Sequence, residues 1–558
     1  MKFSGLVTCV GSLLIAACLT GGCATETETT AALSDPVDSA VFQYALDFEY
    51  SRRDRKRTGR AHLWIPPSAQ RVRGVVMAGF TSMERRFVKN GRIRRACASR
   101  ELAIVFLDTG LSAAEVPELL RRFGDVSGYA ELPRAPLLFV GHSAGGPQAR
   151  DLAIQYAERC FGLIQHRGGL ANGVPAEVPA IASVGQFDEF AGQMRDETGY
   201  EPAWQRALDA TKQMRAEQPD KLVSFLLDAG AGHFHFSDRE AEYLAMWIVK
   251  AAEARIPDGW ASGPHPGQGP PVECVDLDPA GGWLTDLDLR DPKHAPAPAD
   301  EYTGDVAEAG WQFDEQLARA HVAFHAARPL DRKDQFLTWQ DRTWIDVGTR
   351  IFLLDPEWVD DGQTFRLQPA YRDTVPEQHK GRGPKWPRAG EPAGHSDAPI
   401  DLSVCTGPLV RVGPRKLRMQ FDALNRPGER MRAFFIAFSP GDAEYRYTEH
   451  VGFMPRGFTG LTKGKDQTIT FGPIDDLAAD SGPMDLQAVS DSGLPVEYYV
   501  ESGPARVVDG RLKIADLPAR AKYPIEVRVV AYQFGSGIEP RVKSAEPVTQ
   551  TFRITQPK

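Results

Sequence analysis

Between residues 41 and 256, short apolar runs alternate with longer segments of helical periodicity. The apolar runs predict strands that are buried on both faces of a sheet, and they lie at 73–79, 102–108, 135–141, 161–169, 180–188 and 221–230. The segments with helical character lie at 85–101, 115–124, 146–160, 201–218 and 237–255. This alternation predicts a mostly parallel, doubly wound sheet in a single α/β domain.

The pattern differs on either side of these strands and helices. Residues 41–50 and 59–67 predict an antiparallel strand pair, joined by a solvated basic loop at 52–57. A Pro- and Gly-rich stretch from 256 to 271 ends the α/β domain. Residues 257–482 predict a mixed, strand-rich region of unknown role, with a helix over 306–327. Regular strand and turn signals fill 483–558.

The N-terminus predicts export. Lys2 precedes an apolar run through Leu19, and a polar linker covers 24–40. Residues 1–23 resemble a bacterial lipoprotein signal, with Cys18 and Cys23 as the two candidates for lipidation. This predicts a chain outside the cytoplasm, either anchored to the cell envelope by lipid or, after ordinary signal cleavage, secreted.

Composition narrows the classes of partner. Of 558 residues, 42% are hydrophobic and 25% charged, which is typical of a globular protein. The net charge of -9 gives no basis for nucleic-acid binding, which relies on clustered Lys and Arg. No metal-ligand spacing is found, and we expect Cys97 and Cys160, both in segments of helical character, to be small buried hydrophobes.

Candidate chemistry begins at Gly141-His142-Ser143-Ala144-Gly145, between a predicted strand and a predicted helix. A sharp turn there needs small flanking residues, Gly141 and Gly145, and would expose the hydroxyl of Ser143 as a nucleophile. The ordinary alternative is a tight turn with a capping serine. His142 is expected to pack beside the turn.

A serine nucleophile needs a base, and the base needs an orienting acid. Asp188 follows one later strand and His233 follows the next, so both belong to the sheet edge where α/β proteins place their sites. Glu189 is the alternative acid. His235 is the alternative base, or a residue that supports the site.

The same mechanism needs two backbone donors for an oxyanion. The N–H of Ala144 at the start of the helix is one, and the N–H of Phe80, or next Thr81, after the first buried strand is the other. Residues 83–86 would then lie at the pocket rim, as solvated charges or as substrate contacts.

With these motifs, residues 41–256 resemble the α/β-hydrolase superfamily, and within it compact secreted esterases of the dienelactone-hydrolase and polysaccharide-esterase kinds. The resemblance implies a serine hydrolase that cleaves carboxylic esters, with esters on carbohydrates or plant polymers as one substrate class. It implies no cofactor and no metal. A peptidase or amidase with the same triad, and a non-catalytic surface binding protein, remain as alternatives.

A second resemblance covers the C-terminus. "SGLPVEYYVESGPARVVDGRLKI" and the strands after it are similar to bacterial immunoglobulin-like modules. This implies a β-sandwich over 483–558 with a structural or adhesive role. Six tryptophans of the preceding region are expected mainly in cores, with sugar stacking as the alternative: Trp283, Trp311, Trp339, Trp344, Trp358 and Trp386.

Overall fold

A computed structural model gives the arrangement of most of the chain. It describes residues 41–558 except for 53–54, 189–202, 264, 289–291, 330, 341–344, 347–351, 354–356, 376–389, 429–432 and 455–459. Cys18, Cys23, Glu189, Trp344 and Trp386 therefore lie outside the described residues. All contacts given below lie within one compact unit, Pro36–Lys558.

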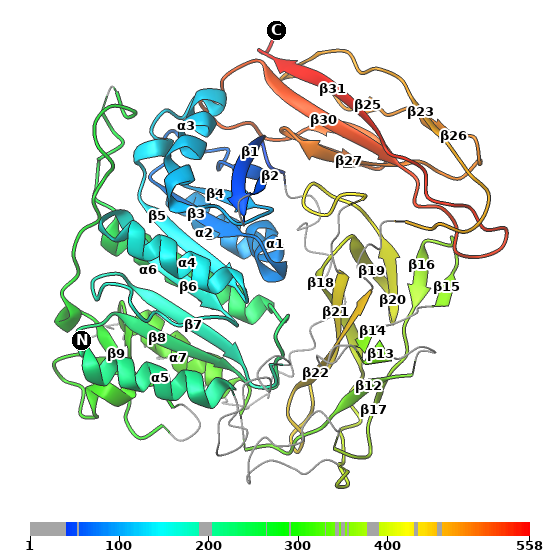
Figure 1. Cartoon of the computed structure of the whole chain (residues 1–558). Helices are drawn as coiled ribbons and strands as arrows, with labels where there is room; N and C mark the ends of the chain where they lie inside the picture. Colours follow the sequence, from blue (N-terminus) through cyan, green and yellow to red (C-terminus); the bar gives the residue numbers. More distant parts are fainter. Residues whose placement is uncertain are drawn as a thin grey trace, which may run out of the picture. The chain divides into compact units, whose positions relative to one another are not determined.

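An eight-stranded sheet forms the first half of this unit, in the order β1-β2-β4-β3-β5-β6-β7-β8 (Figure 1). Its strands are β1 Tyr44–Arg52, β2 Arg55–Trp64, β3 Gly74–Gly79, β4 Leu102–Leu107, β5 Leu137–His142, β6 Cys160–His166, β7 Ala180–Gly185 and β8 Val223–Asp228. The pairs β1-β2 and β2-β4 are antiparallel, and every later pair is parallel. This order and direction is that of the α/β-hydrolase fold, so the predicted fold class is confirmed.

The helices of this part are α1 Ser82–Lys89, α2 Gly91–Ser99, α3 Val116–Ser127, α4 Gly145–Gln155, α5 Ala203–Glu217 and α6 Asp238–Arg255. The helix predicted over 85–101 is in fact two, because Asn90 is extended and its side chain accepts hydrogen bonds from the N–H groups of Arg92 and Ile93. The prediction of a helix to Cys160 is also wrong, since α4 ends at Gln155 and Cys160 begins β6.

Alternate residues of the central strands enter two separate cores. Val75 and Met77 of β3 pack with α3 and α4, whereas Val76 and Ala78 pack with α1, α2 and α6. Helices therefore cover both faces of the sheet, as the continuous apolar runs predict.

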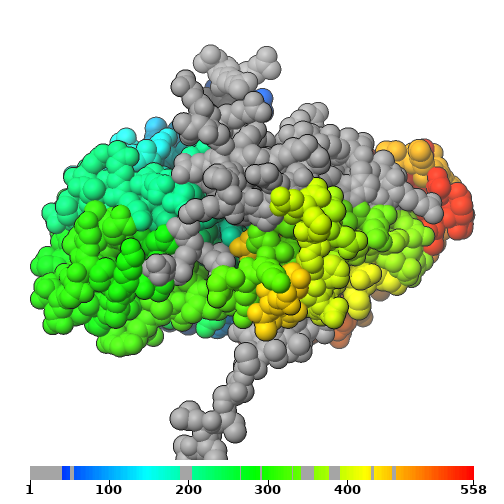
Figure 2. All heavy atoms as spheres, turned by 90° about the horizontal axis from the view of Figure 1, so that it is seen from below, coloured from blue at the N-terminus to red at the C-terminus, as the bar shows by residue number. Residues whose placement is uncertain are grey.

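The strand-rich region begins with β9 Trp283–Asp286, β10 Ala297–Pro298, β11 Ala309–Gln312 and helix α7 Glu315–Ala326, which belong to the green surface in Figure 2. The helix predicted over 306–327 is thus partly wrong. Val306–Glu308 form a single 3₁₀ turn, residues 309–312 pair as β11 with β9, and Asp314 caps α7 by accepting from the N–H of Leu317.

Several small sheets follow. Their strands are β12 Leu337–Trp339, β13 Ile345–Asp346, β14 Phe352–Leu353, β15 Glu357–Val359, β16 Thr364–Arg366, β17 Pro369–Tyr371, β18 Asp401–Thr406, β19 Leu409–Gly413, β20 Lys416–Met419, β21 Ala433–Ser439 and β22 Thr448–Met454. The largest of these sheets has the order β13-β14-β22-β21-β18. Trp311 and Trp339 are buried in hydrophobic clusters, as expected of core tryptophans.

The C-terminal strands are β23 Ile469–Phe471, β24 Leu477–Ala478, β25 Met484–Asp485, β26 Ala488–Ser490, β27 Glu497–Ser502, β28 Ala505–Val508, β29 Arg511–Ile514, β30 Ile525–Tyr532 and β31 Val548–Thr555. They form sheets in the orders β24-β31-β30-β27, β25-β29-β28 and β23-β26. Val527 of β30 and Phe552 of β31 belong to the same buried cluster as Phe123 of α3. The C-terminal strands therefore share a core with the eight-stranded sheet.

Candidate active site

Ser143 occupies the sharp turn between β5 and α4. Its φ is 52°, a left-handed conformation that is uncommon for residues other than glycine. The Ser143 N–H donates to the carbonyl oxygen of His166 at 3.1 Å, and the Ser143 carbonyl accepts from the N–H of Gly146 at 3.0 Å. Such a conformation persists where the surrounding structure fixes it, and this is the geometry that exposes a nucleophilic serine.

Close backbone contacts explain the glycines around this turn. A Cβ on Gly141 would lie 2.3 Å from the Gly145 carbonyl oxygen, and a Cβ on Gly145 would lie 2.7 Å from Oε1 of Glu84. Gly168, which the sequence did not point to, is equally restricted, because its Cβ would lie 2.6 Å from the Cα of Ser143. The turn is therefore packed from both the β3 side and the β6 side.

Asp188 and His233 meet at the carboxyl edge of the sheet. Asp188 lies just after β7 and His233 lies in the loop after β8, and these two strands are parallel neighbours. Nδ1 of His233 donates to Oδ2 of Asp188 at 2.7 Å, with 5% and 11% of the two side chains exposed. A buried carboxylate in this position holds an imidazole in one tautomer and one orientation.

His235 has different neighbours. Its Nδ1 lies 2.9 Å from Oε2 of Glu449, and its Nε2 lies 3.9 Å from Oδ2 of Asp228. Its carbonyl oxygen lies 2.9 Å from Nε2 of His166. The two histidines thus belong to two separate histidine–carboxylate pairs, and both ring nitrogens of His235 face carboxylates.

His142 links the serine turn to the histidine loop. Its Nε2 donates to the carbonyl oxygen of His233 at 2.9 Å, and the two rings lie 4.8 Å apart between centroids. The His142 ring is fully buried, and this burial moves its pKa well below the ordinary value for histidine. A neutral, buried His142 agrees with the prediction that this residue packs beside the turn.

The loop after β3 also contacts the turn. Thr81 Oγ1 lies 2.8 Å from Nδ1 of His142 and 2.9 Å from its carbonyl oxygen. Phe80 directly follows β3, which is the parallel neighbour of β5. Ala144 follows Ser143, is exposed and is the N-cap residue of α4. The two backbone donors expected for an oxyanion thus belong to adjacent strand ends.

The expected position of residues 83–86 at the pocket rim needs correction. Glu84 is fully buried and accepts the His142 N–H through Oε1 at 2.7 Å, while its Oε2 lies 2.7 Å from Thr81 Oγ1. Burial raises the pKa of Glu84 to about 7. Arg85 donates to the carbonyl of Leu424, and Arg86 to that of Val404. These residues connect the site to its surroundings and are not free surface charges.

A further set of buried charges supports the His233 loop. Arg167 follows β6, and its Nε donates to the Gly232 carbonyl oxygen at 3.2 Å. Its Nη2 lies 3.0 Å from Asp228 and 3.4 Å from Glu240, and all three side chains are fully buried. The sequence carries no local motif for Arg167, because its partners come from β8 and α6.

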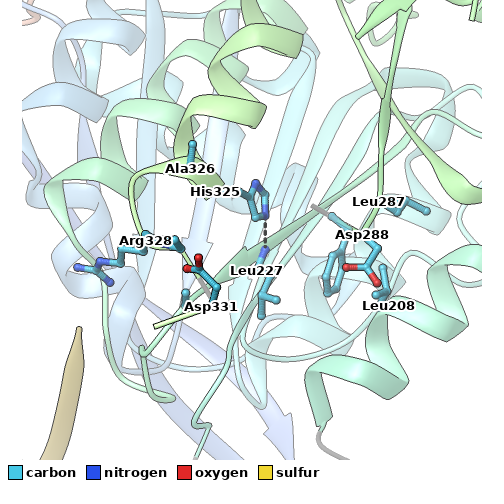
Figure 3. Close-up of a pocket in the computed structure, with 11 residues that line it drawn as sticks. Leu208, Leu227, Leu287, Asp288, His325, Ala326, Arg328 and Asp331 are labelled. Carbon is cyan, nitrogen blue, oxygen red and sulfur yellow. Dashed lines mark hydrogen bonds between the residues drawn. The ribbon is translucent and has the colours of Figure 1, made fainter. Parts of the chain in front are cut away.

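One cavity of about 230 Å³ lies beside β8 and α7, where Nε2 of His325 accepts the N–H of Leu227 at 3.1 Å (Figure 3). Ser143, Asp188 and His233 do not line it. In the part of the chain that the structure describes, no group of three or more His, Cys, Asp or Glu side chains is arranged to hold a metal ion. Nor is any described helix long and apolar enough to cross a membrane.

Comparisons with known proteins add the following. No family model matches the chain, and no curated protein matches it either. Among solved structures, an S-formylglutathione hydrolase from Agrobacterium tumefaciens is 15% identical, with 38% of this chain and 96% of that chain covered and a TM-score of 0.26. A hyperthermophilic esterase from Pyrobaculum calidifontis is 13% identical, with 40% and 90% covered and a TM-score of 0.26. A dienelactone hydrolase from Anabaena variabilis is 15% identical, with 38% and 95% covered and a TM-score of 0.24.

Proposed function

We propose that this chain is a serine hydrolase that cleaves carboxylic esters through Ser143, His233 and Asp188. The observation that carries the proposal is the strained turn at Ser143 on the same sheet edge as the buried His233–Asp188 pair. A strained serine alone could be a structural turn, and a histidine–carboxylate pair alone could be structural. Together, on strands in this order, they are the parts that acyl transfer requires.

In this mechanism Ser143 Oγ attacks the ester carbonyl carbon while Nε2 of His233 takes the hydroxyl proton. Asp188 stabilises the imidazolium that forms. The backbone N–H groups of Ala144 and Phe80 donate to the oxyanion, aided by the N-terminus of α4. His233 then protonates the departing alcohol, and water releases the acid from Ser143 by the same steps.

The contacts of His235 support His233 as the base. A base needs one ring nitrogen for its orienting acid and the other for the serine. Both nitrogens of His235 face carboxylates, those of Glu449 and Asp228, whereas His233 uses Nδ1 for Asp188. In this proposal His235 supports the loop that carries His233 through its contacts with Glu449 and Asp228.

The substrate and location are further parts of the proposal and rest on the sequence. An N-terminal export signal favours action outside the cytoplasm, with lipid attachment at Cys18 or Cys23. Esters on carbohydrates or plant polymers are the substrate class that suits such a location. Cleavage of amides is the second candidate, because the same three residues serve it.

The test uses residues 24–558 and p-nitrophenyl acetate. We expect Ser143→Ala and His233→Ala each to lower kcat by at least about 10³-fold, as loss of a triad member does. Ser112→Ala, at an exposed serine, serves as the control and should keep the wild-type rate. A wild-type rate no higher than that of Ser143→Ala would refute the proposal. Comparison with p-nitroacetanilide distinguishes ester from amide cleavage.

A further inference from the structure

The loop that carries His233, residues 229–237 between β8 and α6, is anchored in the strand-rich region. The ring of Phe234 stacks on Phe434 of β21, with centroids 3.9 Å apart and planes 14° apart. All other members of its buried cluster come from the strand-rich region: Cys405, Phe434, Ile436, Phe438, Tyr447, Val451 and Phe453. One apolar side chain of the loop is thus inserted into a core built by another part of the chain.

Glu449 of β22 makes the polar contacts next to this stack. Its Oε1 accepts the Gly232 N–H at 2.6 Å. Its Oε2 lies 2.9 Å from Nδ1 of His235 and accepts the Tyr447 hydroxyl at 2.8 Å. Gly232 directly precedes His233, and His235 follows it by two residues. A single carboxylate therefore holds the loop on both sides of His233.

The same region also contacts the loop of Asp188. The ring centroids of Phe187 and Phe336 lie 6.5 Å apart. The Arg446 guanidinium lies over the Phe187 ring, 4.6 Å from its centroid. Phe336 and Arg446 both belong to the strand-rich region. The strand-rich region therefore contacts the residue that precedes each member of the His233–Asp188 pair, namely Gly232 and Phe187.

We propose that Glu449 is a positioning residue for His233, acting through the Gly232 N–H and the His235 ring. The strand-rich region then contributes to catalysis by fixing the position of the base, and it is not an appended module. This inference rests on the proposed function, because positioning has a catalytic effect only if His233 is the base.

The contacts of Glu449 with Gly232, His235 and Tyr447 are buried, so their loss destabilises the loop more than the loss of exposed contacts would. Burial alone would raise the pKa of Glu449, but His235, the Tyr447 hydroxyl and the Gly232 N–H hold it below its usual value. An amide in place of this carboxylate keeps the shape but cannot accept hydrogen bonds at both positions. The contacts with Gly232 and His235 then lose the negative charge that strengthens them, and a displacement of about 1 Å at a reacting group can cost about 10²-fold in rate.

The experiment compares Glu449→Gln with Glu131→Gln in the full chain. Glu131 is a matched control, because it is fully buried, accepts the Val72 N–H at 3.0 Å and pairs with Arg520 at 3.0 Å, away from the His233 loop. Three quantities are measured: kcat and KM with p-nitrophenyl acetate, amide hydrogen exchange of the peptide spanning 229–237, and the melting temperature.

We expect Glu449→Gln to lower kcat at least tenfold with KM changed less than twofold, and to speed exchange in 229–237 at least tenfold. Glu131→Gln should lower the melting temperature without either effect. A kcat for Glu449→Gln within twofold of that for Glu131→Gln, or unchanged exchange in 229–237, would overturn the inference.

The exchange measurement separates this inference from the proposed function. If the wild type shows no hydrolysis that depends on Ser143, the proposed function has failed. Faster exchange in Glu449→Gln would then still show that Glu449 holds the loop, while unchanged exchange would reject that as well.

Discussion

Glu84 belongs to a buried hydrogen-bond network with Thr81 and His142. Nε2 of His142 faces the carbonyl oxygen of His233, so it carries the ring proton of the neutral imidazole. Nδ1 is then an acceptor, and it lies 2.8 Å from Thr81 Oγ1. The Thr81 hydroxyl has one proton to donate, and Oε2 of Glu84 at 2.7 Å and the His142 carbonyl oxygen at 2.9 Å are two further acceptors for it. Burial has the largest effect on Glu84 and raises its pKa to about 7, although the hydrogen bonds from His142 and Thr81 lower it.

This arrangement predicts a pH effect on stability. Because the folded-state pKa of Glu84 lies above its unfolded value, ionisation favours the unfolded chain as pH rises from about 4.5 to 7. The cost is on the order of 3 kcal/mol at pH 8. Glu84→Gln keeps both hydrogen bonds without a titrating group, so its melting temperature relative to the wild type should rise between pH 5 and pH 8.

The control is Glu84→Ala, which leaves the His142 N–H without its acceptor and should melt lower than the wild type at both pH values. If Glu84→Gln loses as much stability with rising pH as the wild type does, Glu84 is not the group that titrates.

At single residues, the sequence was informative where chemistry is local. Ser143 lies in a motif whose strand, turn and helix are all within a few residues, so its strained conformation could be predicted. Glu84 could not be placed, because an acidic residue in the first turn of a helix is ordinarily exposed. Its burial arises only when β5 brings His142 against α1.

At the level of elements, α7 protects the outer edge of β8, the last strand of the sheet. Nε2 of His321 donates to the Phe225 carbonyl oxygen at 2.7 Å, and Nε2 of His325 accepts the Leu227 N–H at 3.1 Å. The two histidines lie one helical turn apart, so they meet alternate residues of the strand. Helix α7 thereby supplies hydrogen-bond partners to backbone groups of an edge strand that would otherwise be unpaired.

We expect His325→Ala to destabilise the fold by about 1–3 kcal/mol, because it removes the acceptor of the Leu227 N–H. Gln316→Ala, at an exposed position of the same helix, is the control. Melting temperatures of the two variants at pH 7 provide the measurement. Equal melting temperatures would mean that water replaces the His325 contact at no cost.

The same helix shows the limit of prediction from periodicity. The sequence predicts the existence of α7, because its apolar residues recur at helical spacing. It could not show that 309–312 leaves the helix to pair with β9, since that partner lies well upstream in the chain. Nor does any local pattern mark histidines that contact the edge of a strand.

Across the whole molecule, the C-terminal strands do not stand apart from the eight-stranded sheet. Arg520 pairs with the buried Glu131 and donates to the Gly128 carbonyl at 3.0 Å, and its guanidinium lies over the ring of Tyr129. Sequence patterning gives each strand its buried face, but it does not say which partner covers that face. The resemblance to an immunoglobulin-like module predicts a structural or adhesive role, and it could not predict the buried contacts that link these strands to the end of α3.

Because the C-terminal strands share a hydrophobic core with the eight-stranded sheet, we expect the two to unfold in one transition. Phe552 is almost fully buried in the cluster that also contains Phe123 of α3, and replacing a buried phenylalanine by alanine costs about 3–5 kcal/mol. We expect Phe552→Ala to lower the temperature at which Ser143-dependent hydrolysis is lost. Val489→Ala, at a side chain that is 65% exposed in the same module, should leave that temperature unchanged. If Phe552→Ala creates a separate low-temperature transition while hydrolysis survives to the wild-type temperature, the C-terminal module folds independently.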